Sequence, residues 1–290
     1  MTTSIARRAA LVGLAANAML LVLKAAATGL SDSLTIFSET LNSASDLVAA
    51  VVILLCVHWA SKRPDEDHPF GHRRAEPIAG LLVSIFTGIL GFEVCRTAVT
   101  NLTAGITASN IGPFPVVALC VTAGVKLCLW VYFSRTGRRL DSPAFRATAA
   151  DCRNDVLLAV QGLAAVGVAA VGVPVLDTLS AIVVGLYILY SAHRIGMENI
   201  DYLMGKAPEP ELLARIRSAA AGVDGVVQVG DIKGHYVGTF IHVELTARVD
   251  GSLPTIDSHD LAEATRAAVE QLDAVDRAFI HIEPIGTARP

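Results

Sequence analysis

The chain has 290 residues, of which 53% are hydrophobic and only 17% are charged, and its formal net charge is −4. This composition excludes a disordered chain, a collagen and a coiled coil. Because no basic surplus is available to neutralise phosphates, we set aside nucleic acid as a partner. The five cysteines lie in apolar stretches without a Cys-x-x-Cys pair, which indicates small buried side chains rather than a disulfide scaffold.

Six apolar runs, each close to the length that a helix needs to cross a bilayer, occupy the chain up to about Met204. They cover residues 9–28, 34–60, 77–102, 113–133, 145–171 and 176–204. The first run is too long for the hydrophobic core of a signal peptide, and Lys24 lies inside it. We therefore predict an α-helical membrane bundle of six transmembrane helices.

The cations predict how this bundle is oriented. They occur at the N-terminus and in the second and fourth connectors, as Arg7, Arg8, Lys62, Arg63, Arg73, Arg74, Arg135, Arg138, Arg139 and Arg146. The first, third and fifth connectors contain no Lys or Arg. By the positive-inside rule, we expect a multi-pass protein of the cell membrane, inner or plasma, with both termini in the cytoplasm.

A second domain begins where the composition becomes charged and polar. Pro208 and Pro210 end the helical pattern, so we divide the chain into a six-helix transmembrane domain, 1–207, and a cytoplasmic domain, 208–290. The latter is expected to hold a helix at 212–220, strands at 226–232 and 239–249, a helix at 258–272 and a strand at 277–283. This α-β-β-α-β order is typical of a small α+β fold with helices on one face of a sheet.

Two polar pairs lie inside the predicted membrane helices. Asn42 and Asp46 are four residues apart in the second run, and Asp151 and Asp155 are four apart in the fifth. This spacing places each pair on one helix face. Each carboxylate in a membrane helix costs about 2.5 to 3.5 kcal/mol, so three cost on the order of 8 to 10 kcal/mol unless a cation compensates. The four side chains predict a cation site.

An alternative is that these acids form structural ion pairs with Arg153, Lys126 or Lys24. For a single Asp that interpretation is the better one, whereas two same-face pairs in separate helices favour a bound cation. The donors in the two pairs are all oxygens, which suit manganese, magnesium or calcium better than zinc, since zinc is usually held by nitrogen and sulfur.

Two further groups contain metal-ligating residue types. The second connector holds Asp65, His68 and His72, with Gly71 to permit a turn, and metal binding there competes with simple solvation of a charged loop. In the cytoplasmic domain, His281 and Glu283 share a strand face that His259 can meet, and Glu244 lies on the preceding strand. A solvated sheet face is the alternative for that second group.

These features together resemble the cation diffusion facilitator family. The resemblance rests on the six spans, the polar pairs in spans two and five, the loop from Asp67 to Glu76 and the ending Ile280-His281-Ile282-Glu283-Pro284. It implies that Asn42, Asp46, Asp151 and Asp155 bind a divalent metal that is exported from the cytoplasm in exchange for protons. It also implies a ferredoxin-like cytoplasmic domain that forms a homodimer and can bind regulatory metal.

The same resemblance bears on the choice of metal. Zinc-selective members usually carry His at the position of Asp151, whereas this chain looks like the manganese-type branch. We therefore expect Mn²⁺ as the substrate, with Zn²⁺, Fe²⁺, Co²⁺ or Cd²⁺ as alternatives and no organic cofactor. Asp65, His68 and His72 match a loop site of some members. Glu244, His259, His281 and Glu283 match a cytoplasmic site, although Glu244 stands where other members have His.

Two other functions compete with a metal/proton antiporter. An intramembrane aspartyl protease needs one Asp in each of two facing spans, which Asp46 and Asp155 supply. The Gly-x-Gly-Asp pattern expected of that enzyme is absent, and we therefore do not expect an enzyme. A metal-sensing receptor that transports nothing is the third hypothesis, and a flux measurement distinguishes it from the first.

Overall fold

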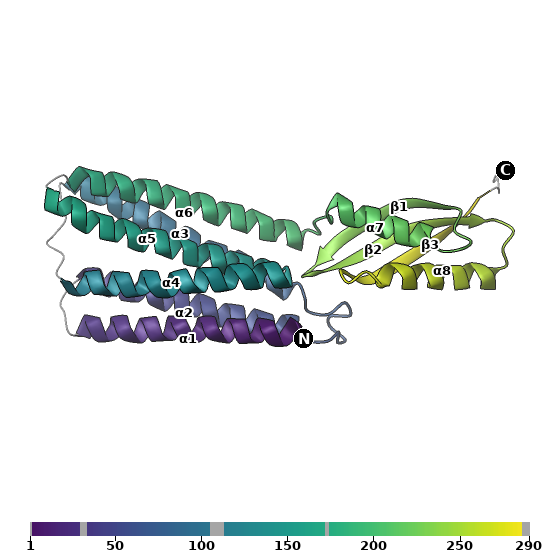
Figure 1. Ribbon diagram of the computed structural model, residues 1–290, viewed down its shortest axis with the longest axis horizontal. Helices are drawn as coiled ribbons and strands as arrows, with labels where there is room; N and C mark the ends of the chain where they lie inside the picture. Colours follow the sequence, from purple (N-terminus) through teal and green to yellow (C-terminus); the bar gives the residue numbers. More distant parts are fainter. Residues whose placement is uncertain (1, 30–33, 105–112, 172–173, 286–290) are drawn as a thin grey trace. The chain divides into compact units, whose positions relative to one another are not determined.

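The computed structural model describes residues 2–29, 34–104, 113–171 and 174–285 (Figure 1). The chain forms two compact units, Met1–Ile200 and Asp201–Pro290. The first unit is helical, and the second contains the sheet. Each unit has its own buried apolar cluster, as expected of separately folded units.

Six long helices form the first unit, and Figure 1 shows them lying side by side. Their bounds are α1 Thr2–Gly29, α2 Leu34–Ala60, α3 Ala75–Ala104, α4 Pro113–Leu140, α5 Pro143–Val171 and α6 Pro174–Leu203. The last three begin at a proline, which is favoured at the first helical position because it lacks the N–H that would be unsatisfied there. The predicted helical bundle is confirmed.

Length and hydropathy mark five helices in the described part of the chain as able to cross a membrane. These segments are Ser4–Ala26, Thr40–Ala60, Ala75–Thr103, Val116–Leu140 and Thr178–Leu203. Large apolar side chains such as Val22, Phe92 and Val183 are exposed along them, as expected of a surface that contacts hydrocarbon. The helix α5 is not in this set, and its first half carries Arg146, Asp151, Arg153 and Asp155.

Glycines bring α3 and α6 into close contact. A Cβ added to Gly91 would lie 3.0 Å from the backbone nitrogen of Leu189 and 3.2 Å from the carbonyl oxygen of Gly185. A Cβ added to Gly185 would lie 2.6 Å from Sγ of Cys95. Membrane helices associate through such small residues because van der Waals packing replaces the hydrophobic effect inside the bilayer.

The second unit has the predicted α-β-β-α-β order. It consists of α7 Pro210–Ala221, β1 Gln228–Val237, β2 Phe240–Asp250, α8 Thr255–Glu270 and β3 Val275–Ile285. The sheet order is β1-β2-β3, with β1 antiparallel and β3 parallel to β2. Ile216 of α7 and Val269 of α8 pack against Val243 and Leu245 of β2 in one buried cluster. The predicted small α/β domain is confirmed.

The strand bounds differ from the sequence prediction by one to five residues, most of all at the end of β1. The strand β1 continues beyond Ile232 to Val237, pairing residue by residue with β2. The pattern is irregular because the register shifts between Val229 and Ile232, which interrupts the alternation of buried and exposed side chains. Gly238, with φ 65°, closes the hairpin in a conformation that favours glycine.

We expect the α3–α6 contact to be sensitive to one added methyl group. Gly185→Ala should lower the unfolding temperature of the purified protein, because overpacking of this kind costs about 1 to 3 kcal/mol. Gly124→Ala in α4 is the matched control, since a Cβ there meets nothing within 4 Å. The control should leave the unfolding temperature unchanged or raise it, as alanine favours helix more than glycine does. Equal effects of the two variants in a thermal unfolding assay would contradict this account.

Candidate metal centre

Three carboxylates from two helices converge inside the membrane unit. One oxygen each from Asp46 of α2 and from Asp151 and Asp155 of α5 lie within 4.8 Å of one another. The four-residue spacing on α5 brings its two acids to the same helix face, as the sequence predicts. Asp155 is buried, and Asp46 and Asp151 are half-buried. The cluster is therefore compact enough for one cation to contact all three acids.

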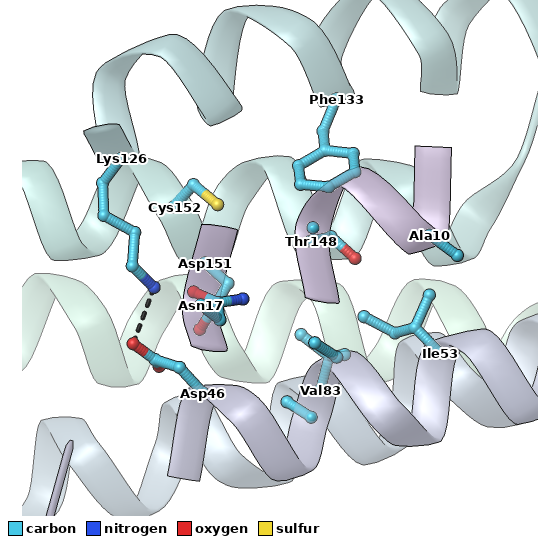
Figure 2. A pocket seen from close by; sticks show the side chains of 13 residues that line it. Ala10, Asn17, Asp46, Ile53, Val83, Lys126, Phe133, Thr148, Asp151 and Cys152 are labelled. Carbon is cyan, nitrogen blue, oxygen red and sulfur yellow. Dashed lines mark hydrogen bonds and ion pairs between the residues drawn. The ribbon is translucent and has the colours of Figure 1, made fainter. Parts of the chain in front are cut away.

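A lysine on a third helix lies against this cluster. Lys126 of α4 is 1% exposed, and its Nζ is 2.7 Å from Oδ2 of Asp46 (Figure 2). The same Nζ is 2.5 Å from Oδ2 of Asp155. The ion pairing with Lys126 that the sequence offered as an alternative to a cation site thus exists. It does not balance the cluster, because three carboxylates and one ammonium leave two formal negative charges.

Arg153, another cation considered as a partner for these acids, is directed toward α6. Its guanidinium donates hydrogen bonds to Oγ of Ser191 at 3.0 Å and to Oδ1 of Asn154 at 3.4 Å. It also lies over the ring of Tyr187, 5.4 Å from the centroid. These contacts connect α5 to α6 and direct the guanidinium away from the carboxylates that Lys126 contacts.

A threonine on α3 orients one of the acids. Oγ1 of Thr87 is 2.6 Å from Oδ1 of Asp151 and 3.0 Å from the carbonyl oxygen of Val83. Thr87 is buried, so its hydroxyl faces Asp151 without competition from bulk water. Asp155 contrasts with this, because neither of its carboxylate oxygens has a hydrogen-bond partner within the described residues apart from the ion pair with Lys126.

A cavity adjoins the cluster. It is lined by Ala10, Gly13, Asn17, Asp46, Ala49, Ala50, Ile53, Val83, Lys126, Phe133, Thr148, Asp151 and Cys152, most of which appear in Figure 2. Its lining residues extend from the acids toward one end of the bundle, since Ile53 follows Asp46 on α2 and Thr148 precedes Asp151 on α5. The helix α1 begins and α2 ends at that side, next to the cations Arg7, Arg8, Lys62 and Arg63. We refer to this side as the basic end.

Two asparagines near the acids differ in their placement. Asn17 of α1 is 8% exposed, lines the cavity, and its Oδ1 has no hydrogen-bond partner within the described part of the chain. Asn42 lies one turn before Asp46 on α2, is half-buried, and is not among the residues that line the cavity. Both offer an amide oxygen, the donor type that hard divalent cations accept.

The loop between α2 and α3 brings together its three predicted residues. Ligand atoms of Asp65, His68 and His72 all lie within 4.8 Å of one another. The Asp65 carboxylate is 3.4 Å from Nδ1 of His68 and 3.3 Å from Nε2 of His72. The backbone N–H of His68 donates to Asp65 and lowers the pKa of that carboxyl. Gly71 has φ 82°, so the turn that returns His72 to Asp65 depends on a conformation that favours glycine.

The four residues predicted for a cytoplasmic site do not form one compact group in a single chain. Oε2 of Glu283 is 2.7 Å from Nε of Arg248, and this bond lowers the pKa of Glu283. Glu244, His259 and His281 are exposed. Across the described residues, three-membered groups with ligand atoms within 4.8 Å occur at the membrane cluster and at the loop, and this set is not one of them. A site that uses these four residues stays a prediction.

Two family models match the chain along nearly its whole length. The cation efflux transmembrane domain matches residues 10–204, and the cation efflux protein cytoplasmic domain matches residues 208–285. The chain belongs to the cation efflux family. Its family is one of transporters, which excludes the aspartyl protease as an explanation of the paired acids.

Several curated relatives align over most of their lengths. An uncharacterised transporter of Methanocaldococcus jannaschii is 32% identical over 87% of this chain and 88% of that protein. The manganese efflux system protein MneS of Bacillus subtilis is 30% identical over 95% of this chain and 94% of that protein. The cation-efflux pump FieF of Escherichia coli is 29% identical over 96% and 92% respectively.

The sequence alone did not indicate two polar residues of this centre. Thr87 and Asn17 belong to no spaced polar pair like those of α2 and α5, and their contacts depend on how α3 and α1 pack against α5 and α2. An unpaired polar residue in a membrane helix is the only signal that points to them. Lys126 carried a stronger signal because it is charged.

We expect Thr87 to act on metal binding through Asp151. Thr87→Val removes the hydroxyl and keeps the shape, so it should weaken divalent metal binding by about 10- to 100-fold, the usual effect of losing a hydrogen bond to a metal ligand. Thr87→Ser should retain most of the affinity. Thr97→Val, on the exposed side of α3, is the matched control and should bind as the parent does. Titration calorimetry that shows equal affinity for Thr87→Val and Thr97→Val would contradict this role.

Proposed function

We propose that this transporter exports manganese(II) from the cytoplasm in exchange for protons. The observation that carries the proposal is the cluster of Asp46, Asp151 and Asp155, in which the single ammonium of Lys126 leaves two formal negative charges uncompensated. A divalent cation neutralises this remainder. The penalty for carboxylates inside a membrane is then offset when the substrate is bound.

The donor set supports manganese over softer metals. The cluster offers carboxylate oxygens, and Asn17 and Asn42 place amide oxygens on the neighbouring helices α1 and α2. Histidine and thiolate, which favour zinc, are not among the proposed ligands, although Cys152 lines the cavity. The relative MneS is named for manganese efflux, whereas the name of FieF specifies no single metal. Zinc, iron(II), cobalt and cadmium are the competing substrates.

The cavity suggests where the metal enters. It extends from the carboxylates toward the basic end of the bundle, which the positive-inside rule assigns to the cytoplasm. Both termini then lie in the cytoplasm of a cell-membrane protein. A cation from the cytoplasm reaches Asp46 and Asp151 along this cavity, and a rearrangement of the helices exposes it to the other side.

Protons are the proposed counter-substrate. When the metal leaves, the cluster again holds two uncompensated negative charges within the membrane, because Lys126 neutralises only one of three. Protons can supply the missing positive charge, and the next metal ion then displaces them. Metal exit is thereby coupled to proton entry without a histidine at the site. The cluster titrates as a unit because its members interact strongly.

Two accessory features complete the proposal. Asp65, His68 and His72 form a loop site for a further divalent ion, supported by their mutual distances. The cytoplasmic unit forms a homodimer about a two-fold axis, since closed two-fold dimers are the commonest assembly and a small sheet with helices on one face leaves a surface to bury. In that dimer, Glu244, His259, His281 and Glu283 are proposed to bind regulatory metal.

The purified protein in liposomes should transport Mn²⁺, and Asp155→Asn should reduce the flux at least about tenfold, because it removes a charge that contacts the ion. Glu93→Gln is the matched control, since Glu93 is an exposed acid on α3 that pairs with Arg96. It should transport at the parent rate. A dye that reports Mn²⁺ inside the liposomes measures the flux, and gel filtration establishes that each variant is folded.

The same assay separates antiport from simple diffusion and from a receptor. Flux should accelerate when the compartment that receives metal is made acidic. If the flux depends on Asp155 but does not change with the pH gradient, the antiport mechanism is wrong and the protein mediates facilitated diffusion. Zero flux with retained metal binding would instead favour a metal-sensing receptor.

Metal selectivity should follow the donor atoms. Asp151→His introduces an imidazole nitrogen, so the ratio of Zn²⁺ to Mn²⁺ transport should rise, and Asn42→His should act in the same direction. Competition between the two metals at equal free concentration measures the ratio. Glu93→His provides an imidazole outside the site and should leave the ratio unchanged. If both site variants kept the parent ratio, the argument from ligand chemistry would be wrong.

A further inference from the structure

Lys126 occupies the place in the cluster where a metal ion needs to bind. Its Nζ lies within hydrogen-bond distance of Asp46 on α2 and of Asp155 on α5, so it bridges two of the three carboxylates of the proposed metal site. A divalent cation held by the same two carboxylates sits between the same oxygens. The ammonium and the metal therefore cannot occupy this position together.

A cavity beside the cluster can receive the ammonium group of Lys126 when it leaves the carboxylates. Lys126 itself lines the cavity beside the cluster, together with the apolar side chains of Ala50, Ile53 and Val83 and the unpaired amide oxygen of Asn17. A lysine reaches its charge through four flexible methylene groups, and its three N–H donors need no fixed plane. The side chain can therefore withdraw from Asp46 and Asp155 into the cavity without a change in the path of α4.

Charge balance favours an exchange rather than a permanent ion pair. With a divalent ion at the three carboxylates and Lys126 still charged nearby, the formal charge of the site is zero. Without the metal, the ammonium at Asp46 and Asp155 reduces the repulsion among the acids. Lys126 therefore stabilises the metal-free site more than it stabilises the metal-bound site.

We propose that Lys126 is a tethered cation that competes with the transported metal for Asp46 and Asp155. It occupies these carboxylates when the site is empty and is displaced when metal binds. The inference rests on the proposed function, since it takes the three acids as the transport site. Its consequence is that Lys126 lowers the affinity for metal and speeds release, because the returning ammonium takes over the carboxylates as the ion departs.

The test measures Mn²⁺ binding to the full chain in lipid nanodiscs by titration calorimetry, with His72→Ala in every sample so that the loop site does not contribute. Lys126→Met should bind Mn²⁺ about tenfold more tightly or more, since a like charge a few ångströms from the ion is removed. Lys126→Gln, which keeps a polar group, should act in the same direction and serves if the methionine variant does not fold. Lys126→Arg keeps the charge and should bind no more tightly than the parent.

Two controls make the result specific. Lys24→Met removes another buried lysine, on α1, that does not line the cavity, and it should leave the affinity unchanged. Asp46→Asn should abolish the binding that is being measured. In liposomes, Lys126→Met should lower both the KM and the kcat for Mn²⁺, because binding is tighter and release is slower.

The outcomes separate the inference from the proposed function. If the parent shows no Asp46-dependent binding of Mn²⁺, the proposed transport site is wrong, and so is the inference that Lys126 competes with metal there. If the parent binds Mn²⁺ through Asp46 but Lys126→Met and Lys126→Gln bind equally or more weakly, the transport site stands and Lys126 is only a structural ion-pair partner. Tighter binding that Lys126→Arg does not reproduce supports the exchange.

Discussion

The electrostatic cost of three carboxylates inside a membrane helix bundle governs the rest of this structure. Asp46, Asp151 and Asp155 repel one another at close range, and hydrocarbon cannot solvate them. Two groups of the bundle contact these acids, the ammonium of Lys126 and the hydroxyl of Thr87. These contacts leave a deficit of positive charge. We propose that this deficit allows the site to attract a divalent cation and to release it in exchange for other positive charge.

The helices position the acids and the groups that contact them. The i to i+4 spacing on α5 places two acids on one face, and α2, α3 and α4 each contribute one further group from outside. Elsewhere in the unit, the glycines Gly91 and Gly185 allow α3 and α6 to approach at backbone distance. Van der Waals packing at these close contacts holds the two helices together.

In the cytoplasmic unit, the charged side chains are at least partly exposed to water rather than enclosed among helices. Its ion pairs, such as Arg248 with Glu283 and Arg266 with Glu263, are partly exposed, so water screens them and each contributes little to stability. Its stability comes from the apolar cluster of β2 with α7 and α8. Histidines and acids on its surface are therefore free of the constraint that operates in the membrane unit, and their proximity along the sequence does not imply a site within one chain.

The sequence by itself determined which segments form long apolar helices and which acids share a helix face. Both properties depend on local geometry, namely the length of apolar runs and the 3.6-residue period of the helix, so residues 34–60 and the pair Asp151 and Asp155 were predictable. The loop group also followed from short spacing, because Gly71 can return His72 to Asp65 within a single turn. The order of helices and strands in the cytoplasmic unit was readable for the same reason.

Only the tertiary structure decided which groups from other helices meet these acids. Thr87 and Asn17 reach the centre because of how α3 and α1 pack, and helix packing depends on side-chain shapes along the whole contact rather than on any short motif. The sequence left three candidate cations for the acids, and the structure placed Lys126 there while directing Arg153 to α6. In the cytoplasmic unit, the register of β2 with β3 set Glu283 beside Arg248, a pairing that alternation along one strand cannot specify.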